Sequence, residues 1–387
     1  MGALDGLRVI EIAGRGPGPF AGMMLSDMGA EVVRVDRIPS SDSASTASRF
    51  EPVNRGRKSI ALDLKRPEAI EVLMRLVDRA DVLYEGFRPG VAERLGFGPE
   101  VCLARKPSLV YARATGWGQT GPLSQSAGHD IDYIAVAGAL DPIGVSGGPP
   151  VVPLNLVGDY AGGAMLLAFG ILCGVIEARS SGIGQVVDAA MIDGASLLMT
   201  MFHGRRQAGA WRDNRGSNYV DGGAPYYAVY ETLDHKYVAV GAIERQFREE
   251  LFRRIGYLDA PDPMHYGDWP EVRERLASIF LSRTRDEWSD LLEGTDACFA
   301  PVLGIGEVAN HPHMVARSGF LELAGVGQPA PAPRFSRTHG SVSSPPPAIG
   351  EHTRRLLSEC GFTEEDIAAL IGADSAFQAG GFRRRPA

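Results

Sequence analysis

The chain has 387 residues, of which 44% are hydrophobic and 22% are charged. This length predicts two domains, and the ordinary composition excludes both a disordered chain and one embedded throughout in a membrane. The formal net charge of −8 argues against a nucleic-acid partner, because such proteins concentrate positive charge on one face.

The first 115 residues alternate between short apolar runs and amphipathic segments. They predict strands and helices in turn: strands at 8–13, 31–35, 81–87 and 109–114, and helices at 20–28 and 68–79. Such alternation favours a parallel sheet covered by helices on both faces. We therefore expect an α/β fold, with a large Rossmann-like parallel-sheet domain over residues 1–200.

The longest apolar run, residues 161–176, is bounded by Asp159 and Glu177. It is shorter than the roughly 20 residues that cross a bilayer, and it contains four glycines. We expect a buried, closely packed helix and no contact with a membrane. A strand at 184–191 and a helix capped by Asp193 are predicted to follow.

The second half of the chain has a different pattern. Residues 226–231 and 237–242 flank a short polar turn and predict a β-hairpin, with a helix at 246–255 after it. We expect a small α+β domain at 225–325, joined to the large domain by a linker at 201–224. After a Pro-rich connector at 326–350, helices at 351–360 and 363–371 would lie in the segment 330–387 that completes the large domain.

Residues 14–19 (Gly-Arg-Gly-Pro-Gly-Pro) follow the first predicted strand and imitate a dinucleotide-binding fingerprint. Pro19 occupies the place of the third glycine. Pro17 and Pro19 also lack the backbone N–H groups that would hold a pyrophosphate. We therefore interpret the segment as a tight turn that starts a helix at a proline, and not as an NAD site.

Basic residues are enriched in the first third of the chain, where residues 1–115 contain 17 Lys and Arg against 15 Asp and Glu. Arg37 and Arg88 come directly after predicted strands, where open α/β sheets place their ligands. Lys65, Arg94 and the basic run Arg55-Gly56-Arg57-Lys58 lie in the same third of the chain. Each could be an ordinary exposed side chain, but as a set at strand ends they favour recognition of phosphate groups.

Three further residues have the chemistry to move a proton. His129 lies at the predicted start of a helix, Asp159 precedes the apolar run, and Glu244 follows the second hairpin strand. Each has a structural alternative: Asp159 could be an N-cap, Glu244 could begin a surface helix, and His129 could be a hydrogen-bonded structural residue. On spacing alone these structural roles are favoured over a joint catalytic one.

Segments spread over much of the chain resemble the class III CoA-transferase superfamily: 6–11, 29–36, 62–65, 111–119, 184–188, 296–298 and 350–353. Within it, three segments are similar to those of the racemase branch. Residues 128–133 match the segment of its catalytic histidine, 155–159 that of its catalytic aspartate, and 241–244 that of a glutamate that partners the histidine. The resemblance therefore assigns His129, Asp159 and Glu244. Asp132 departs from it, because an asparagine is usual there, and an extra carboxylate could raise the basicity of His129.

The resemblance implies a racemase that interconverts (R)- and (S)-2-methylacyl-CoA thioesters by 1,1-proton transfer through an enolate. It also implies an intertwined homodimer whose active site lies between the large domain of one subunit and the small domain of the other. CoA would be part of the substrate, with no separate cofactor and no metal. The implied CoA contacts are Arg37, Leu62, Asp63, Leu64, Lys65, Gly86, Phe87, Arg88, Arg94, Gly128, Asp130, Ile131, Asp132 and Tyr133.

Two other functions stay open. In the transferase branch the equivalent of Asp159 is a nucleophile that forms covalent adducts, and a non-catalytic CoA-binding protein is the third reading. His129 with Glu244 favours the racemase, in which case Asp159 must hold a proton in one direction and burial should raise its pKa. The scattered Cys102, Cys173, Cys298 and Cys360 predict reduced, mostly buried thiols in a cytoplasmic protein, and the implied substrate points to lipid and fatty acid metabolism.

Overall fold

The structure of the protein is a computed structural model that describes residues 1–40, 49–261 and 265–380. The chain folds into two compact units, each described by itself below. The large unit contains Met1–Ala137, Leu154–Leu198 and Ser318–Ala387, and the small unit contains Gly138–Pro153 and Met199–Arg317. The chain therefore passes from one unit to the other four times.

The large unit is built on a seven-stranded sheet with the order β12-β3-β2-β1-β4-β5-β6. Six strands run parallel: β1 (Arg8–Ile12), β2 (Glu31–Arg37), β3 (Arg57–Leu62), β4 (Val82–Glu85), β5 (Val110–Thr115) and β6 (Val186–Ala190). Only the short edge strand β12 (Ala376–Phe377) is antiparallel to its neighbour. The predicted α/β class is confirmed, but β3 was missed because Arg57 and Lys58 hide its apolar pattern.

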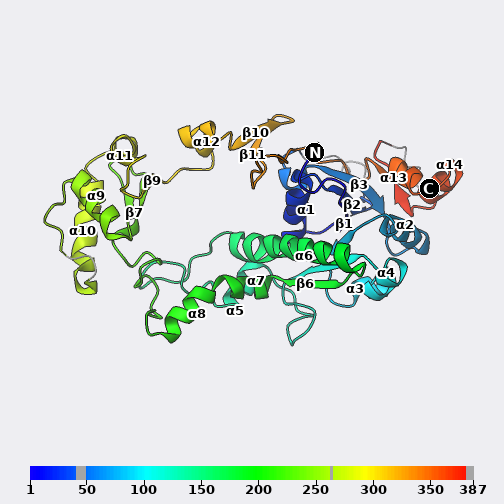
Figure 1. The fold of residues 1–387 in the computed structure, drawn as a ribbon, viewed down its shortest axis with the longest axis horizontal. Helices are drawn as coiled ribbons and strands as arrows, with labels where there is room; N and C mark the ends of the chain where they lie inside the picture. The colour runs from blue at the N-terminus through cyan, green and yellow to red at the C-terminus, as the bar shows by residue number, and fades with distance from the viewer. Residues whose placement is uncertain (41–48, 262–264, 381–387) are drawn as a thin grey trace. The chain divides into compact units, whose positions relative to one another are not determined.

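Helices cover both faces of this sheet, as expected for parallel strands (Figure 1). Neighbouring residues of β1 point to opposite faces, so Val9 and Ile10 belong to two separate hydrophobic clusters. One cluster packs under α1 (Pro17–Asp27) and α6 (Leu166–Ser181). The other packs under α2 (Pro67–Val77), α4 (Pro99–Arg105), α13 (Thr353–Glu359) and α14 (Glu364–Gly372).

A π-helix at Leu156–Met165 leads directly into α6, so the apolar helix extends beyond the predicted run at both ends. This helix has 26 residues, and within the described parts of the chain it is the one helix long and apolar enough to cross a membrane. The prediction that it is too short to cross a bilayer was therefore wrong. Half of its most apolar window is buried, and core helices of soluble proteins pass the same test. Length and composition therefore support a membrane span only weakly.

The prediction of a buried, closely packed helix holds for one face of this segment and is wrong for the other. Gly162, Gly163 and Ala164 are buried, whereas Met165, Phe169 and Ile176 are 53%, 66% and 71% exposed. Cys173 lies on the same helix and is exposed as well. The four cysteines are free, but only Cys102 is fully buried, so the expectation of mostly buried thiols does not hold.

The segment after β6 differs from its prediction. Asp193 does not cap a helix but lies in the first turn of α7 (Met191–Leu198). The chain then enters the small unit at α8 (Thr200–Gln207), which is a separate helix. The helix predicted to run from Asp193 through Met199 and Met201 is thus two helices.

The small unit contains the predicted hairpin, formed by antiparallel β7 (Tyr227–Glu231) and β8 (Tyr237–Gly241), with β9 (Phe299–Pro301) beside β8. Its apolar core lies between this sheet and three helices: α9 (Arg245–Ile255), α10 (Trp269–Phe280) and α11 (Arg285–Leu292). Shorter elements complete the two units: α3 (Val91–Leu95), α5 (Asp130–Val136), α12 (Pro312–Ala316), the hairpin β10 (Phe320–Leu323) with β11 (Val326–Pro329), and single turns at Pro52–Asn54, Tyr266–Asp268 and Val308–Asn310.

Candidate active site

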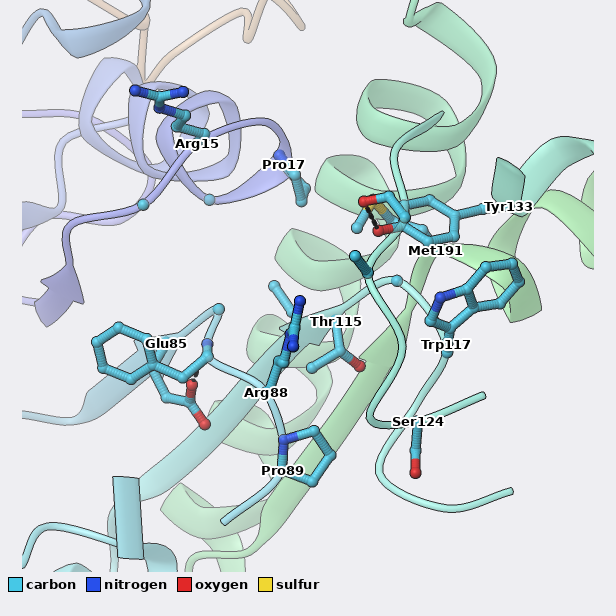
Figure 2. Close-up of a pocket in the computed structure, with 18 of the residues that line it drawn as sticks. Arg15, Pro17, Glu85, Arg88, Pro89, Thr115, Trp117, Ser124, Tyr133 and Met191 are labelled. Atoms are coloured by element: carbon cyan, nitrogen blue, oxygen red, sulfur yellow. Dashed lines mark hydrogen bonds between the residues drawn. The ribbon is translucent and has the colours of Figure 1, made fainter. Parts of the chain in front are cut away.

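A cavity of about 400 Å³ opens within the large unit, at the carboxyl ends of the parallel strands (Figure 2). Open α/β sheets bind their ligands at this edge. The walls come from the segments that follow β1, β4 and β5, together with the loop that precedes α5. Six of the residues predicted from the sequence line it: Gly86, Phe87, Arg88, Gly128, His129 and Tyr133.

The other predicted contacts lie outside the lining of this cavity. Arg37 and Leu62 are paired at the carboxyl ends of β2 and β3, on the same edge of the sheet. Leu62 and Leu64 pack in or against the hydrophobic core, so their side chains are poorly placed for a ligand. Asp63 accepts a hydrogen bond from the backbone N–H of Lys65, at 3.2 Å, and Lys65 itself is exposed.

Arg94 and the remaining predicted contacts are placed by two short helices. Arg94 is exposed on α3, which begins after the turn that contains Arg88. In α5, Ile131 is exposed and Asp130 is buried. The structure thus places Arg37, Lys65 and Arg88 at or after strand ends, while Asp130 faces the interior of the protein. The prediction was wrong for Arg55 and Arg57, because both are buried in ion pairs, with Asp27 and Glu11 respectively.

His129 is the N-cap residue of α5, which confirms the helix start predicted there. Its side chain is exposed and lines the cavity. The backbone N–H of His129 donates to Oδ2 of Asp132, at 2.9 Å. The unusual carboxylate at position 132 therefore closes the first turn of the helix and fixes the backbone that carries His129.

Asp159 lies inside the first turn of the π-helix, whose N-cap is Asn155, so the reading of Asp159 as an N-cap is wrong. Nδ2 of Asn155 donates to Oδ2 of Asp159 at 3.0 Å. Burial raises the pKa of the half-buried Asp159, and the nearby Asp130 carboxylate raises it further, against the lowering effects of Asn155 and His129. The direction agrees with the expectation for a proton carrier. The rare π-helical backbone is also often found at functional sites.

The glycine–proline turn (residues 14–19) forms one wall of the site. Pro17 is the first residue of α1, which confirms the predicted turn and helix start. Gly16 has φ +67°, and a Cβ added there would lie 3.1 Å from Oδ2 of Asp159. The turn itself was predicted from the sequence, but its contact with Asp159 was not, because Gly16 and Asp159 are far apart in the chain.

Glu85 was missed by the sequence analysis, although it ends β4 one residue before the predicted contact Gly86. It is 2% exposed and lines the cavity, and its Oε2 accepts a hydrogen bond of 2.6 Å from the backbone N–H of Phe87. Arg113 lies beside it, with 3.6 Å between Nε and Oε1. Burial nevertheless dominates and raises the pKa of Glu85 to about 7. A polar residue at a strand end was the signal that could have found it.

Aromatic rings form one side of the cavity, where Trp117 and Tyr133 lie together (Figure 2). Trp117 meets Tyr133 edge to face, with ring centroids 4.8 Å apart. The hydroxyl of Tyr133 donates to the carbonyl of Gly128, and burial followed by the charge of Asp159 raises the pKa of Tyr133. Met191 also lines the cavity and gives it an apolar surface.

Glu244 belongs to the small unit, where it is exposed and occupies the N-cap position of α9. It follows β8 as predicted, and its partnership with His129 stays a prediction. Near it in the small unit, an apolar hollow of about 520 Å³ lies on one face of the β7–β8–β9 sheet and includes Tyr227, Val229 and Phe299. Among the residues that the structure describes, no group of three or more His, Cys, Asp and Glu side chains could hold a metal ion.

The chain is similar to known proteins along most of its length. The model of "CoA-transferase family III" matches residues 4–353. The chain is 44% identical to α-methylacyl-CoA racemase of Mus musculus and 43% identical to that of Homo sapiens, in both cases over 95% of this chain and 96% of the relative. It is 30% identical to human succinyl-CoA:glutarate CoA-transferase, over 96% of this chain and 89% of that protein.

Solved structures have the same fold. A CAIB/BAIF family protein from Brucella suis superposes with a TM-score of 0.80 at 24% identity, over 93% of this chain and 99% of that one. Rv3272 from Mycobacterium tuberculosis gives a TM-score of 0.76 at 28% identity, over 92% and 99% of the two chains. The parallel-sheet fold is therefore shared along nearly the whole chain.

Proposed function

The chain belongs to CoA-transferase family III, and we propose that it is a racemase that interconverts the (R)- and (S)-forms of 2-methylacyl-CoA thioesters. One observation carries this conclusion. Relatives named α-methylacyl-CoA racemase are 43–44% identical over 95% of the chain, well above the 30% identity to a named CoA-transferase. The cavity supports the same reaction because His129 lines it and lies close enough to Asp159 to affect its pKa.

The reaction needs two proton carriers. The carbon next to a thioester is a weak acid, and inversion requires that a proton leave one face and another arrive at the opposite face. In one direction His129 removes the α-proton, the electron pair moves into the thioester carbonyl, and protonated Asp159 delivers its proton to the other face of the enolate. In the reverse direction the two residues exchange these roles. Such groups typically contribute about 10²–10⁴-fold each.

The raised pKa of Asp159 suits this mechanism. An ordinary aspartate would be fully ionised near neutral pH and could act only as a base. Burial favours the neutral acid, so a larger fraction of Asp159 holds the proton that it must donate. In our proposal Glu244 orients the imidazole of His129, a task that a covalent mechanism at Asp159 would not require.

CoA is part of the substrate in this proposal, and no further cofactor is required. The cations Arg37, Lys65, Arg88 and Arg94 come at or after the ends of β2, β3 and β4 and would face the phosphates, since Arg groups match phosphate geometry. The acyl chain would contact Met191, whose side chain adapts to different shapes. A branched acyl thioester places the reaction in lipid and fatty acid metabolism, and we propose a cytoplasmic protein.

We further propose a homodimer whose active site combines the large unit of one subunit with the small unit of the other. The exposed side of the apolar helix supports it. Met165, Phe169 and Ile176 recur at helical spacing on one face and are each more than half exposed. A contiguous apolar stripe of this kind marks an interaction surface in a folded protein.

Deuterium exchange tests the function directly. The purified protein is incubated in D₂O with (R)- or (S)-2-methylacyl-CoA and no CoA acceptor, and C2 deuteration and optical purity are followed. We expect deuterium at C2 together with racemisation, both abolished by His129→Ala combined with Asp159→Asn. Absence of exchange together with transfer of CoA to a free acid would identify a CoA-transferase. Binding without either reaction would identify a CoA-binding protein.

A further inference from the structure

The glycine–proline turn is the sequence motif that the proton transfer leaves without a chemical role. It connects β1 to α1 and runs against the carboxylate of Asp159. A Cβ at Gly16 would lie 3.1 Å from Oδ2 and 3.2 Å from Cγ of Asp159. The backbone of Gly16 therefore lies against one side of the carboxylate, and a side chain at this position would both crowd Asp159 and strain the positive φ.

The π-helix is shaped for the same close approach. A Cβ added to Gly163 would lie 3.0 Å from Cβ of Pro17 and 2.8 Å from Cγ of Met191. Gly158 is equally restricted, because its Cβ would lie 2.7 Å from Oδ2 of Asp130. The glycines at positions 16 and 163 thus let the turn and the helix that carries Asp159 approach each other closely.

Two buried side chains donate hydrogen bonds to the backbone of the turn and fix its position. The hydroxyl of Tyr84 donates to the carbonyl of Gly18 at 3.0 Å, and Tyr84 is 1% exposed. The guanidinium of Arg57, which is also 1% exposed, donates to the carbonyl of Pro19 and forms an ion pair of 3.2 Å with the buried Glu11. Tyr84 and Arg57 therefore fix two successive carbonyl groups in the first turn of α1, directly after Gly16.

We propose that Tyr84 is a positioning residue for Asp159: by fixing Gly18 it presses Gly16 against the carboxylate and keeps water from that side. The inference rests on the proposed role of Asp159 in proton transfer. Tyr84 lies on β4 and acts through the glycine–proline turn, not by exchanging a proton. Loosening the turn hydrates the carboxylate, which favours the ionised form and moves the pKa of Asp159 down towards its ordinary value.

The other groups that act on Asp159 are unchanged when Tyr84 is altered. His129, Asp130 and Tyr133 face it from the segment of α5, and Asn155 bonds to it from its own helix. Arg15 is the charged residue of the turn itself. A change in the protonation of Asp159 in a Tyr84 variant would therefore report on hydration and not on the loss of a neighbouring charge.

The test compares Tyr84→Phe with Tyr111→Phe as a matched control. Tyr111 is a fully buried tyrosine on β5 whose hydroxyl has no hydrogen-bond partner within the described parts of the chain. The pKa of Asp159 is measured by ¹³C NMR of carboxyl-labelled aspartate, with its signal assigned by Asp159→Asn. We expect a fall of about half a pH unit in Tyr84→Phe and no change in Tyr111→Phe.

Kinetics give the second readout. In Tyr84→Phe, kcat should fall about 10-fold with little change in KM, and the limb of the pH profile that belongs to Asp159 should move to lower pH. Circular dichroism and thermal melting establish that both variants are folded. A folded Tyr84→Phe protein with an unshifted Asp159 signal would overturn the proposal. The NMR titration needs no turnover, so it tests the role of Tyr84 separately from the proposed reaction. Failure of the proposed reaction would appear instead as a wild-type protein that does not exchange the C2 proton of its substrate.

Discussion

The backbone N–H of Asp159 donates a hydrogen bond of 2.6 Å to Oδ2 of Asp130. Asp130 follows His129 directly in the chain, so this bond joins the segments that carry the two proposed proton carriers. It also brings a second carboxylate close enough to raise the pKa of Asp159. Asp130 is itself buried, at 5% exposure, and so contributes to the geometry and to the electrostatics of the site.

Replacing Asp130 should therefore affect both properties. Asp130→Ala removes the acceptor of the Asp159 N–H and should lower the free energy of unfolding by about 1–3 kcal/mol. It should also lower the pKa of Asp159 and slow racemisation about 10-fold or more. Asp130→Asn keeps an acceptor oxygen and should retain most of the stability. Urea denaturation and exchange kinetics check this, and equal stability of the two variants would argue against the hydrogen bond.

The two-carrier mechanism predicts an asymmetric effect of single substitutions. In Asp159→Asn, His129 can still remove the proton of one enantiomer, so that enantiomer should exchange with D₂O while racemisation falls about 10²–10⁴-fold. His129→Gln should show the same effect with the opposite enantiomer. Mass spectrometry combined with chiral analysis separates the two signals. Loss of exchange with both enantiomers in each variant would contradict the assignment of one carrier to each face.

Glu85 should make stability depend on pH near neutrality. Its pKa is about 7 in the folded protein and about 4.5 in the unfolded chain. Between these values the folded state holds a proton that the unfolded state has lost, so the free energy of unfolding falls as pH rises through this window. Glu85→Gln should remove up to roughly 3 kcal/mol of that dependence. Urea titrations at pH 5 and pH 8 measure it, and the same wild-type-to-variant difference at both values would contradict the titration.

Glu244→Gln tests the proposed partnership with His129. The substitution should slow the half-reaction in which His129 is the base, because the neutral amide stabilises an imidazolium less than a carboxylate does. Exchange that begins at Asp159 should be less affected. Glu249→Gln is a suitable control, since Glu249 is an exposed glutamate on the same helix, paired with Arg245. If exchange from both enantiomers slowed equally, the proposed partnership of Glu244 with His129 would be contradicted.

If the exposed apolar face of Met165, Phe169 and Ile176 is the dimer interface, a charged side chain placed on it should weaken the dimer. Phe169→Glu and Ile176→Glu each place a carboxylate on a face whose side chains are more than half exposed in the single chain. Neither should greatly affect the fold, but both should shift a dimer towards monomer. Light scattering after size-exclusion chromatography measures the mass. If both variants remained dimers, the interface would have to lie on another surface.

Much of the fold could be predicted because the parallel strands β1, β2, β4 and β5 are short apolar runs that stand out from their surroundings. The strand β3 could not, since its first two residues are Arg57 and Lys58. Arg57 is nevertheless buried, because it forms an ion pair with Glu11 on another strand and donates to the carbonyl of Pro19. The lengthened apolar helix was missed for a similar reason: Asp159 reads as a helix boundary, yet Asp130 and Asn155 accommodate it inside a π-helix.

The site was predictable in its components and not in its arrangement. The segments of His129, Asp159 and Glu244 were identified by their resemblance to a family. The approach of Gly16 to Asp159 depends on a contact between distant parts of the chain. Local sequence carries no record of such contacts.

Two of the four passages of the chain between its units lie close in sequence to the proposed proton carriers. The segment of His129 ends shortly before the first passage, after Ala137, and the segment of Asp159 begins shortly after the second, at Leu154. The hydrogen bond between Asp130 and Asp159 therefore joins, inside the large unit, the segment by which the chain leaves that unit and the segment by which it returns. The positions of the two carriers relative to each other are thus set by contacts within the large unit.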